Sequence, residues 1–139
     1  MRVVDDANGF TVYGSKSTSD YLNVIIGAPA EIAEFVTKRF KDLGLAAHLR
    51  QPRWQHLKLA YVLGLRVVTP GKGLGSKMLL KALGASKKRG AAAVFLHVLA
   101  DVGHEADLRR FYESHGFRFA SFGSTFFDEQ LPVFWRRLS

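Results

Sequence analysis

A glycine-rich turn, Gly71-Lys72-Gly73-Leu74-Gly75, is the part of this sequence whose residue types best suit a ligand. It separates an apolar stretch, residues 57–68, from a helical pattern that begins at about residue 74. Glycines let the backbone approach an anion closely, and a helix N-terminus adds unpaired N–H groups and a partial positive charge. Lys72 and Lys77 add direct charge. The arrangement predicts a phosphate-binding turn.

Two common phosphate-binding motifs do not fit this turn. A Walker turn needs two glycines separated by four residues and then Lys and Ser or Thr. Counted from Gly71, the second glycine position is Ser76, and Met78 follows Lys77. The dinucleotide fingerprint Gly-x-Gly-x-x-Gly fails at Ser76 or, counted from Gly73, at Met78. These motifs are therefore excluded, and a glycine-rich connection without a ligand remains the alternative.

Side chains with the chemistry of a general base lie in and after a second apolar stretch, residues 91–99. His97 lies on the strand face opposite Val94, Leu96 and Val98, and a histidine in an apolar strand is more often a hydrogen-bonded core residue than a catalyst. Asp101, His104 and Glu105 follow it. Glu105 suits a helix start equally well, because acids interact favourably with the helix dipole there. No residue is thus fixed as the base, and a water relay is the alternative.

The elements that position these residues alternate between strands and helices. The hydrophobic periods and turn residues predict them in this order: strands at 10–14 and 21–26, a helix at about 30–43 capped by Gly44, a strand at 45–49, a turn at 51–53, a strand at 57–68, a helix at about 74–88, a strand at 91–99, a helix at about 105–114 ended by Gly116, and an antiparallel pair at 117–123 and 131–138.

The strand–helix–strand segment from 57 to 99 predicts the fold class. Two apolar strands joined by a helix form a βαβ unit, whose strands are parallel. Gly64 inside the first of them indicates a bulge or a close backbone approach. We therefore expect an α/β (α+β) fold with a mixed central sheet, in a single domain over residues 1–139.

Residues 57–117 resemble the core of the GCN5-related N-acetyltransferase (GNAT) family. That family places an R/Q-x-x-G-x-G/A turn between a central strand and a helix. Here Pro70-Gly71-Lys72-Gly73-Leu74-Gly75 matches it except at Pro70, which replaces the Arg or Gln. The family pattern A-x-x-(L/F)-Y-x-x-x-G-F is matched by Phe111-Tyr112 and Gly116-Phe117, with Leu108 in place of the alanine and Glu105 where the family often has Asn.

The resemblance implies an N-acetyltransferase that uses acetyl-CoA and a direct attack by a primary amine. It implies a central parallel strand pair that splays apart, with backbone groups near Leu65, Arg66 and Val67 holding the pantetheine and polarising the thioester. Tyr112 resembles the family's general acid, which protonates the CoA sulfur; the alternative is a helix tyrosine that packs its ring and wets its hydroxyl. His97 and Glu105 are the other candidate catalytic residues. The residues expected at the pyrophosphate are Gly71, Lys72, Gly73, Leu74, Gly75 and Ser76.

Composition restricts the classes of protein further. The chain has 139 residues, 47% of them hydrophobic and none of them cysteine, which excludes disulfides, thiolate metal sites and a cysteine nucleophile. The acids of the first ten residues and the lack of a run long enough to span a membrane predict a cytoplasmic protein with no membrane partner. Asp5-Asp6 and Asp128-Glu129 show no recurring ligand spacing, so we expect solvated pairs and no metal.

The formal net charge of +8 favours an anionic ligand, although a solvated basic surface explains it equally well. A phosphorylated cofactor and RNA are the two candidates, and Arg50, Arg53 and Trp54 place an aromatic ring beside basic side chains. The alternatives to a plain N-acetyltransferase are therefore an enzyme acting on aminoacyl-tRNA or a ribosomal protein, and a non-catalytic module that binds nucleic acid or protein. The acceptor is open between a small molecule, a peptide and a protein amine, as is the choice between monomer and homodimer.

Overall fold

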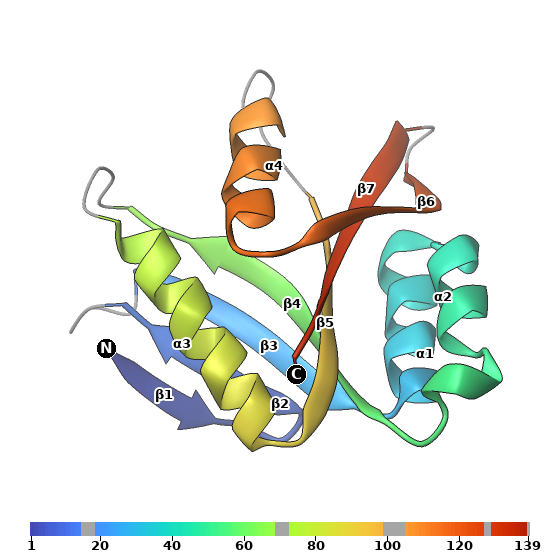
Figure 1. The fold of residues 1–139 in the computed structure, drawn as a ribbon, viewed down its shortest axis with the longest axis horizontal. Helices are drawn as coiled ribbons and strands as arrows, with labels where there is room; N and C mark the ends of the chain where they lie inside the picture. The colour runs from blue at the N-terminus through green and yellow to red at the C-terminus, as the bar shows by residue number, and fades with distance from the viewer. Residues whose placement is uncertain (15–18, 69–72, 99–104, 127–128, 139) are drawn as a thin grey trace.

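One sheet of seven strands forms the centre of the computed structural model, which describes residues 1–14, 19–68, 73–98, 105–126 and 129–138 (Figure 1). The strand order is β1-β2-β3-β4-β5-β7-β6. Only β4 and β5 are parallel, and every other neighbouring pair is antiparallel, so the predicted mixed sheet is confirmed. The strands are β1 Arg2–Asp5, β2 Gly9–Tyr13, β3 Tyr21–Gly27, β4 Lys58–Arg66, β5 Ala91–His97, β6 Arg118–Phe126 and β7 Glu129–Arg137.

Helices cover both faces of the sheet and create two apolar clusters. Helices α3 (Leu74–Lys88) and α4 (Glu105–Ser114) lie on one face, and α1 (Pro29–Phe40) and α2 (Leu43–Leu49) lie on the other (Figure 1). Because side chains alternate along a strand, β4 sends Ala60 and Val62 into the α3 cluster and Leu59 and Tyr61 into the α1–α2 cluster. The two central strands are therefore apolar on both faces, as residues 57–68 predicted.

The parallel pair β4–β5 separates at one end. Its register runs from Lys58 opposite Ala91 to Val62 opposite Leu96. Beyond Val62, β4 continues to Arg66 and pairs only with β3. The register of β3 with β4 shifts at Asn23/Val24, so Leu63 is the extra residue beside Gly64, and the predicted bulge is confirmed.

The segment after α1 differs from the sequence prediction. The expected helix at 30–43 with Gly44 as its cap is wrong, because α1 ends at Phe40 and Lys41 takes the left-handed conformation with φ of 55°. The expected strand at 45–49 is also wrong. Asp42 Oδ1 accepts the N–H of Leu45 at 2.9 Å and so caps α2. Five residues of apolar sequence do not distinguish a strand from a helix, and here the cap does.

The bounds of α3 and α4, on the opposite face from α1, were predicted closely. Helix α3 spans Leu74–Lys88 and α4 spans Glu105–Ser114, as the periodicity indicated. Gly116 has φ of +84° after α4, and the N–H of Phe117 returns to the carbonyl of Tyr112 at 3.1 Å. Buried Phe117 thus packs back onto the sheet, as expected for a left-handed helix end.

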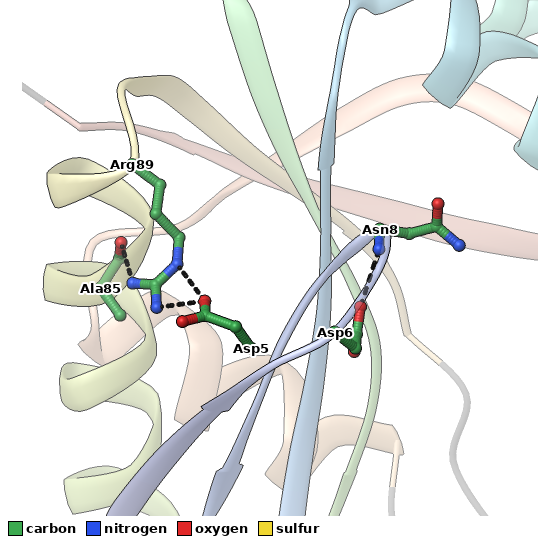
Figure 2. A network of polar contacts seen from close by, with 5 residues as sticks. All are labelled: Asp5, Asp6, Asn8, Ala85 and Arg89. Carbon is green, nitrogen blue, oxygen red and sulfur yellow. Dashed lines mark hydrogen bonds and ion pairs between the residues drawn. The ribbon is translucent and has the colours of Figure 1, made fainter.

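Strand β1 was not predicted, and an ion pair ties it to α3 (Figure 2). The Arg89 guanidinium donates to Asp5 Oδ1 from Nε at 3.1 Å and from Nη2 at 2.6 Å, and to the carbonyl of Ala85. Asp6 instead accepts the N–H of Asn8 at 2.9 Å in the turn before β2. Asp5 therefore serves structure; Asp128 lies outside the described residues.

Among the described residues no helix is long and apolar enough to cross a membrane. The same residues contain no group of three or more His, Asp or Glu side chains that could hold a metal ion.

Candidate active site

The N-terminus of α3 is open to an anion. Gly73 is the residue that precedes the helix, with φ of +64°, and as a glycine it has no side chain to cap the first turn. That turn also holds no acidic residue. The first N–H groups of an α-helix lack intrahelical partners, so those of Leu74, Gly75 and Ser76 are directed at whatever lies before the helix. Gly71 and Lys72 lie outside the described residues.

Two contacts fix this turn against its neighbours. A Cβ at Gly75 would lie 3.7 Å from the ring of Phe111 and from Val67, so α3 begins where α4 and the end of β4 meet. The Ser76 hydroxyl lies 2.6 Å from His115 Nε2. His115 Nδ1 lies 2.7 Å from the carbonyl of Phe111, to which it donates its proton, and Nε2 therefore accepts from Ser76.

A buried carboxylate fixes the strand end before the turn. Asp20 is 3% exposed, and its Oδ1 accepts the N–H of Val68 at 2.7 Å. Within the described part of the chain, β3 and Asp20 hold this end of β4, and its pairing with β5 stops at Val62.

The predicted pantetheine site lies along this unpaired edge. Leu65 and Arg66 are the last residues of β4, opposite Leu22 and Tyr21 of β3. On the β5 side they have no strand partner among the described residues, since the pairing ends at Val62. Backbone groups of a strand point alternately to its two sides. The gap is therefore lined by polar backbone groups that β5 does not satisfy, with Val67 following Arg66.

Tyr112 lies in α4, is 6% exposed, and belongs to the apolar cluster against which Leu65 and Val67 pack. Its ring packs edge-on against Phe111 and Phe117, with ring centroids 5.3 Å and 5.6 Å away. Burial raises the pKa of Tyr112 to about 12. The phenol therefore keeps its proton at neutral pH, as a proton donor must.

His97 belongs to a buried relay that the sequence did not reveal. The Tyr61 hydroxyl lies 2.5 Å from His97 Nδ1, and His97 Nε2 lies 2.7 Å from Asp42 Oδ2. The side chains of His97 and Asp42 are closed to solvent. Phe40 covers the imidazole with ring centroids 4.4 Å apart. The alternation of side chains along the parallel strands β4 and β5 could have predicted that Tyr61 and His97 lie on the same face of the sheet. No sequence pattern near Asp42 indicated that it joins them.

The hydrogen bonds of the relay give each atom a role. A carboxylate only accepts, so His97 Nε2–H donates to Asp42 and His97 Nδ1 accepts the Tyr61 O–H. Burial, above all, raises the pKa of Tyr61, and the negative charge of Asp42 raises it further. Tyr61 is therefore a neutral hydroxyl whose proton already points at a base. This is the logic of a hydroxyl–imidazole–carboxylate triad.

The remaining candidate base is less defined. Glu105 is the first residue of α4, as its fit to a helix start predicted. Asp101 and His104 lie outside the described residues. Tyr112 thus lies on the α3–α4 face of the sheet, and the relay of Tyr61, His97 and Asp42 lies on the α1–α2 face.

Part of the sequence and the fold resemble known proteins. Residues 53–117 match the family model described as the acetyltransferase (GNAT) family. This segment holds the glycine-rich turn and α4, so the resemblance to the GNAT acetyltransferases drawn from these motifs is confirmed over residues 53–117. No curated protein sequence matches significantly.

Solved structures show the same fold at low sequence identity. NAA60 of Arabidopsis thaliana in complex with acetyl-CoA is 16% identical, with a TM-score of 0.60 over 94% of this chain and 75% of that one. Another acetyltransferase is 15% identical, with a TM-score of 0.56 over 94% of this chain and 69% of that one. A mutant agmatine N-acetyltransferase in apo form is 10% identical, with a TM-score of 0.56 over 86% and 71% of the two chains.

Proposed function

We propose that residues 1–139 form one acetyl-CoA-dependent N-acetyltransferase domain that transfers an acetyl group to a primary amine by direct attack. One observation carries the proposal. The parallel pair β4–β5 separates after Val62 and Leu96, and an uncapped, acid-free helix N-terminus at Gly73 follows the same strand. A phosphorylated ligand with an extended amide arm satisfies both sets of unpaired backbone groups.

The residues present fit acetyl-CoA, the ligand of the NAA60 complex. The backbone from Gly71 through Ser76 would hold its pyrophosphate, and Lys72 and Lys77 would add charge. Backbone groups of Leu65, Arg66 and Val67 would hold the pantetheine and polarise the thioester carbonyl. When bound, acetyl-CoA supplies the activated acyl thioester. Pro70 replaces the family's Arg or Gln, so the cradle rests on backbone N–H groups and Lys72.

Tyr112 is the proposed general acid. Its hydroxyl keeps its proton at neutral pH, and α4 holds it in the apolar cluster against which Leu65 and Val67 pack. The departing thiolate gains that proton from Tyr112 Oη, which is recharged from solvent.

The relay is the proposed route for the proton of the amine. Tyr61 Oη accepts a proton from the attacking nitrogen while its own proton passes to His97 Nδ1. The imidazolium formed is stabilised by the Asp42 carboxylate on Nε2. His97 is thus the base and Tyr61 the group that meets the amine. Glu105 remains the alternative base.

An acetyl-CoA titration with an amine panel tests the function. We expect saturable binding and release of free thiol with at least one acceptor drawn from small amines, peptides, proteins and aminoacyl-tRNA. Mass spectrometry of the acceptor then identifies the acetylated nitrogen. Binding without thiol release for every acceptor would leave a non-catalytic module, and an absence of binding would refute the cofactor assignment.

A further inference from the structure

A cavity of about 330 Å³ opens where β6 begins and β7 ends. Among the residues that the structure describes, three of the five that line it are arginines and none is acidic. The lining residues are Gly116, Arg118, Trp135, Arg136 and Arg137. We call this cavity the arginine notch.

The notch follows from the lengths of the two strands. Strand β6 begins at Arg118, opposite Trp135. Strand β7 continues to Arg137, which is paired with Ala93 of β5. The outer edge of β7 therefore has no strand beside it at Arg136 and Arg137, because the chain there belongs to the end of α4. Such an edge leaves backbone groups and side chains available to a ligand.

The walls of the notch are held in place before any ligand arrives. Arg136 Nη1 donates to the carbonyl of His115 at 2.6 Å. A Cβ at Gly116 would lie 3.3 Å from the Arg136 guanidinium, so the glycine makes room for it.

The aromatic wall is equally fixed. Trp135 stacks on Phe95 with centroids 5.8 Å apart and planes at 14°. Trp54 meets it edge-on at 6.0 Å, and the Arg137 guanidinium lies 6.0 Å from the Trp135 ring. On the far side Arg53 lies 4.8 Å over the ring of Trp54. Trp54 is buried and Arg53 is exposed, so one more basic side chain lies beyond the buried Trp54.

The charge of the notch has no carboxylate partner among the side chains that the structure describes. None of Arg118, Arg136 and Arg137 forms an ion pair with a carboxylate among the described residues. Like charges around one cavity repel, and a bound anion removes that cost. Guanidinium groups match phosphate oxygens in a bidentate fashion, and an aromatic ring offers a face or edge to a base.

We propose that the arginine notch binds the phosphate of a nucleotide, with Trp135 contacting the base. The nucleotide is either free or a unit of single-stranded RNA, and the exposed Arg53 beyond Trp54 is a further cation that suits the RNA. The site is independent of the proposed acetyl transfer and uses none of its residues.

Fluorescence anisotropy with a labelled single-stranded RNA decamer tests the proposal, with AMP and inorganic phosphate as competitors. The test variant is Arg118→Gln/Arg137→Gln, which spares the structural Arg136. The control Lys87→Gln/Lys88→Gln removes the same charge from exposed positions of α3. We expect RNA affinity to fall about tenfold or more in the notch variant only, and the slope of log K against log salt to lose about 1.4. Thermal unfolding of both variants should match the wild type.

The competitors separate the sources of the phosphate. AMP displacing RNA better than inorganic phosphate supports a nucleotide site, and AMP binding as tightly as the decamer assigns it to a free nucleotide. Equal weakening in both double variants, or no binding of RNA or AMP at about 50 mM salt, would overturn the proposal. So would loss of RNA binding in Gly73→Asp, since the RNA would then occupy the proposed cofactor turn. A separate titration with acetyl-CoA tests the proposed acetyltransferase function, so that its failure is distinguishable from failure of the notch proposal.

Discussion

At the scale of single residues, Tyr112 carries the most direct prediction. Tyr112→Phe keeps the buried ring and removes the proposed acid, so kcat should fall about 100-fold while the Kd for acetyl-CoA is unchanged. Steady-state kinetics and calorimetry measure the two quantities. Because burial raises the pKa of Tyr112 to about 12, the wild type should show no alkaline limb from this group below about pH 11. Equal turnover in Tyr112→Phe would remove the acid role.

The relay makes a second prediction at this scale. Tyr61→Phe removes the hydroxyl that meets the amine, so kcat near neutral pH should fall about 100-fold with KM for acetyl-CoA unchanged. Activity should recover as pH rises towards the pKa of the acceptor amine, because a neutral amine needs less help from a base. His97→Gln should behave in the same way. A structural role alone would lower stability without this recovery.

Gly73 tests the cofactor turn. Its φ of +64° is tolerated by Asn but not by most residues. Gly73→Asn therefore preserves the backbone, whereas Gly73→Asp adds a negative charge where the pyrophosphate is proposed. Acetyl-CoA affinity should fall about tenfold more in the Asp variant than in the Asn variant. Equal affinities by calorimetry would place the pyrophosphate elsewhere.

At the scale of elements, two glycines of the helical layer should respond oppositely to alanine. Gly116→Ala forces a side chain into φ of +84° and towards Arg136, so unfolding free energy should fall by about 1–2 kcal/mol. Gly84→Ala lies in exposed α3 with nothing within 4 Å and should raise it by up to about 1 kcal/mol. Urea unfolding of both variants measures the contrast. A stable Gly116→Ala variant would contradict the role of Gly116 in ending α4.

The elements also show where local sequence was sufficient. Helix α3 was predicted over its full length because Met78, Leu79, Ala82 and Leu83 repeat at helical spacing and are all buried. The segment after α1 was not predicted correctly, because it depends on two single residues, the left-handed Lys41 and the capping Asp42. Hydrophobic periodicity does not indicate either of them. Strand β1 was not predicted for a similar reason. Its four residues are too few to show a hydrophobic alternation, and the residue that stabilises the strand, Arg89, lies far along the chain.

At the scale of the whole molecule, buried tyrosines set the alkaline limit of stability. The pKa of Tyr112 is about 12 in the folded protein against 10.0 for the free group. Between these values the unfolded chain binds fewer protons, so stability is full below pH 10 and declines as pH rises towards 12. The Tyr112 contribution amounts to about 3 kcal/mol at most. Urea unfolding at several pH values should therefore show a shallower decline for Tyr112→Phe than for the wild type. Parallel curves would contradict it.

The sequence by itself determined the mixed fold, the parallel order of β4 and β5, the place of the glycine-rich turn and the family motifs. These are local or periodic features, and each reports on a few neighbouring residues. Only the tertiary structure decided the relay and the arginine notch. Tyr61 and His97 are 36 residues apart and Asp42 and His97 are 55 apart, while the notch joins the end of β7 to Gly116. No local pattern records such contacts, because the packing of helices and strands creates them.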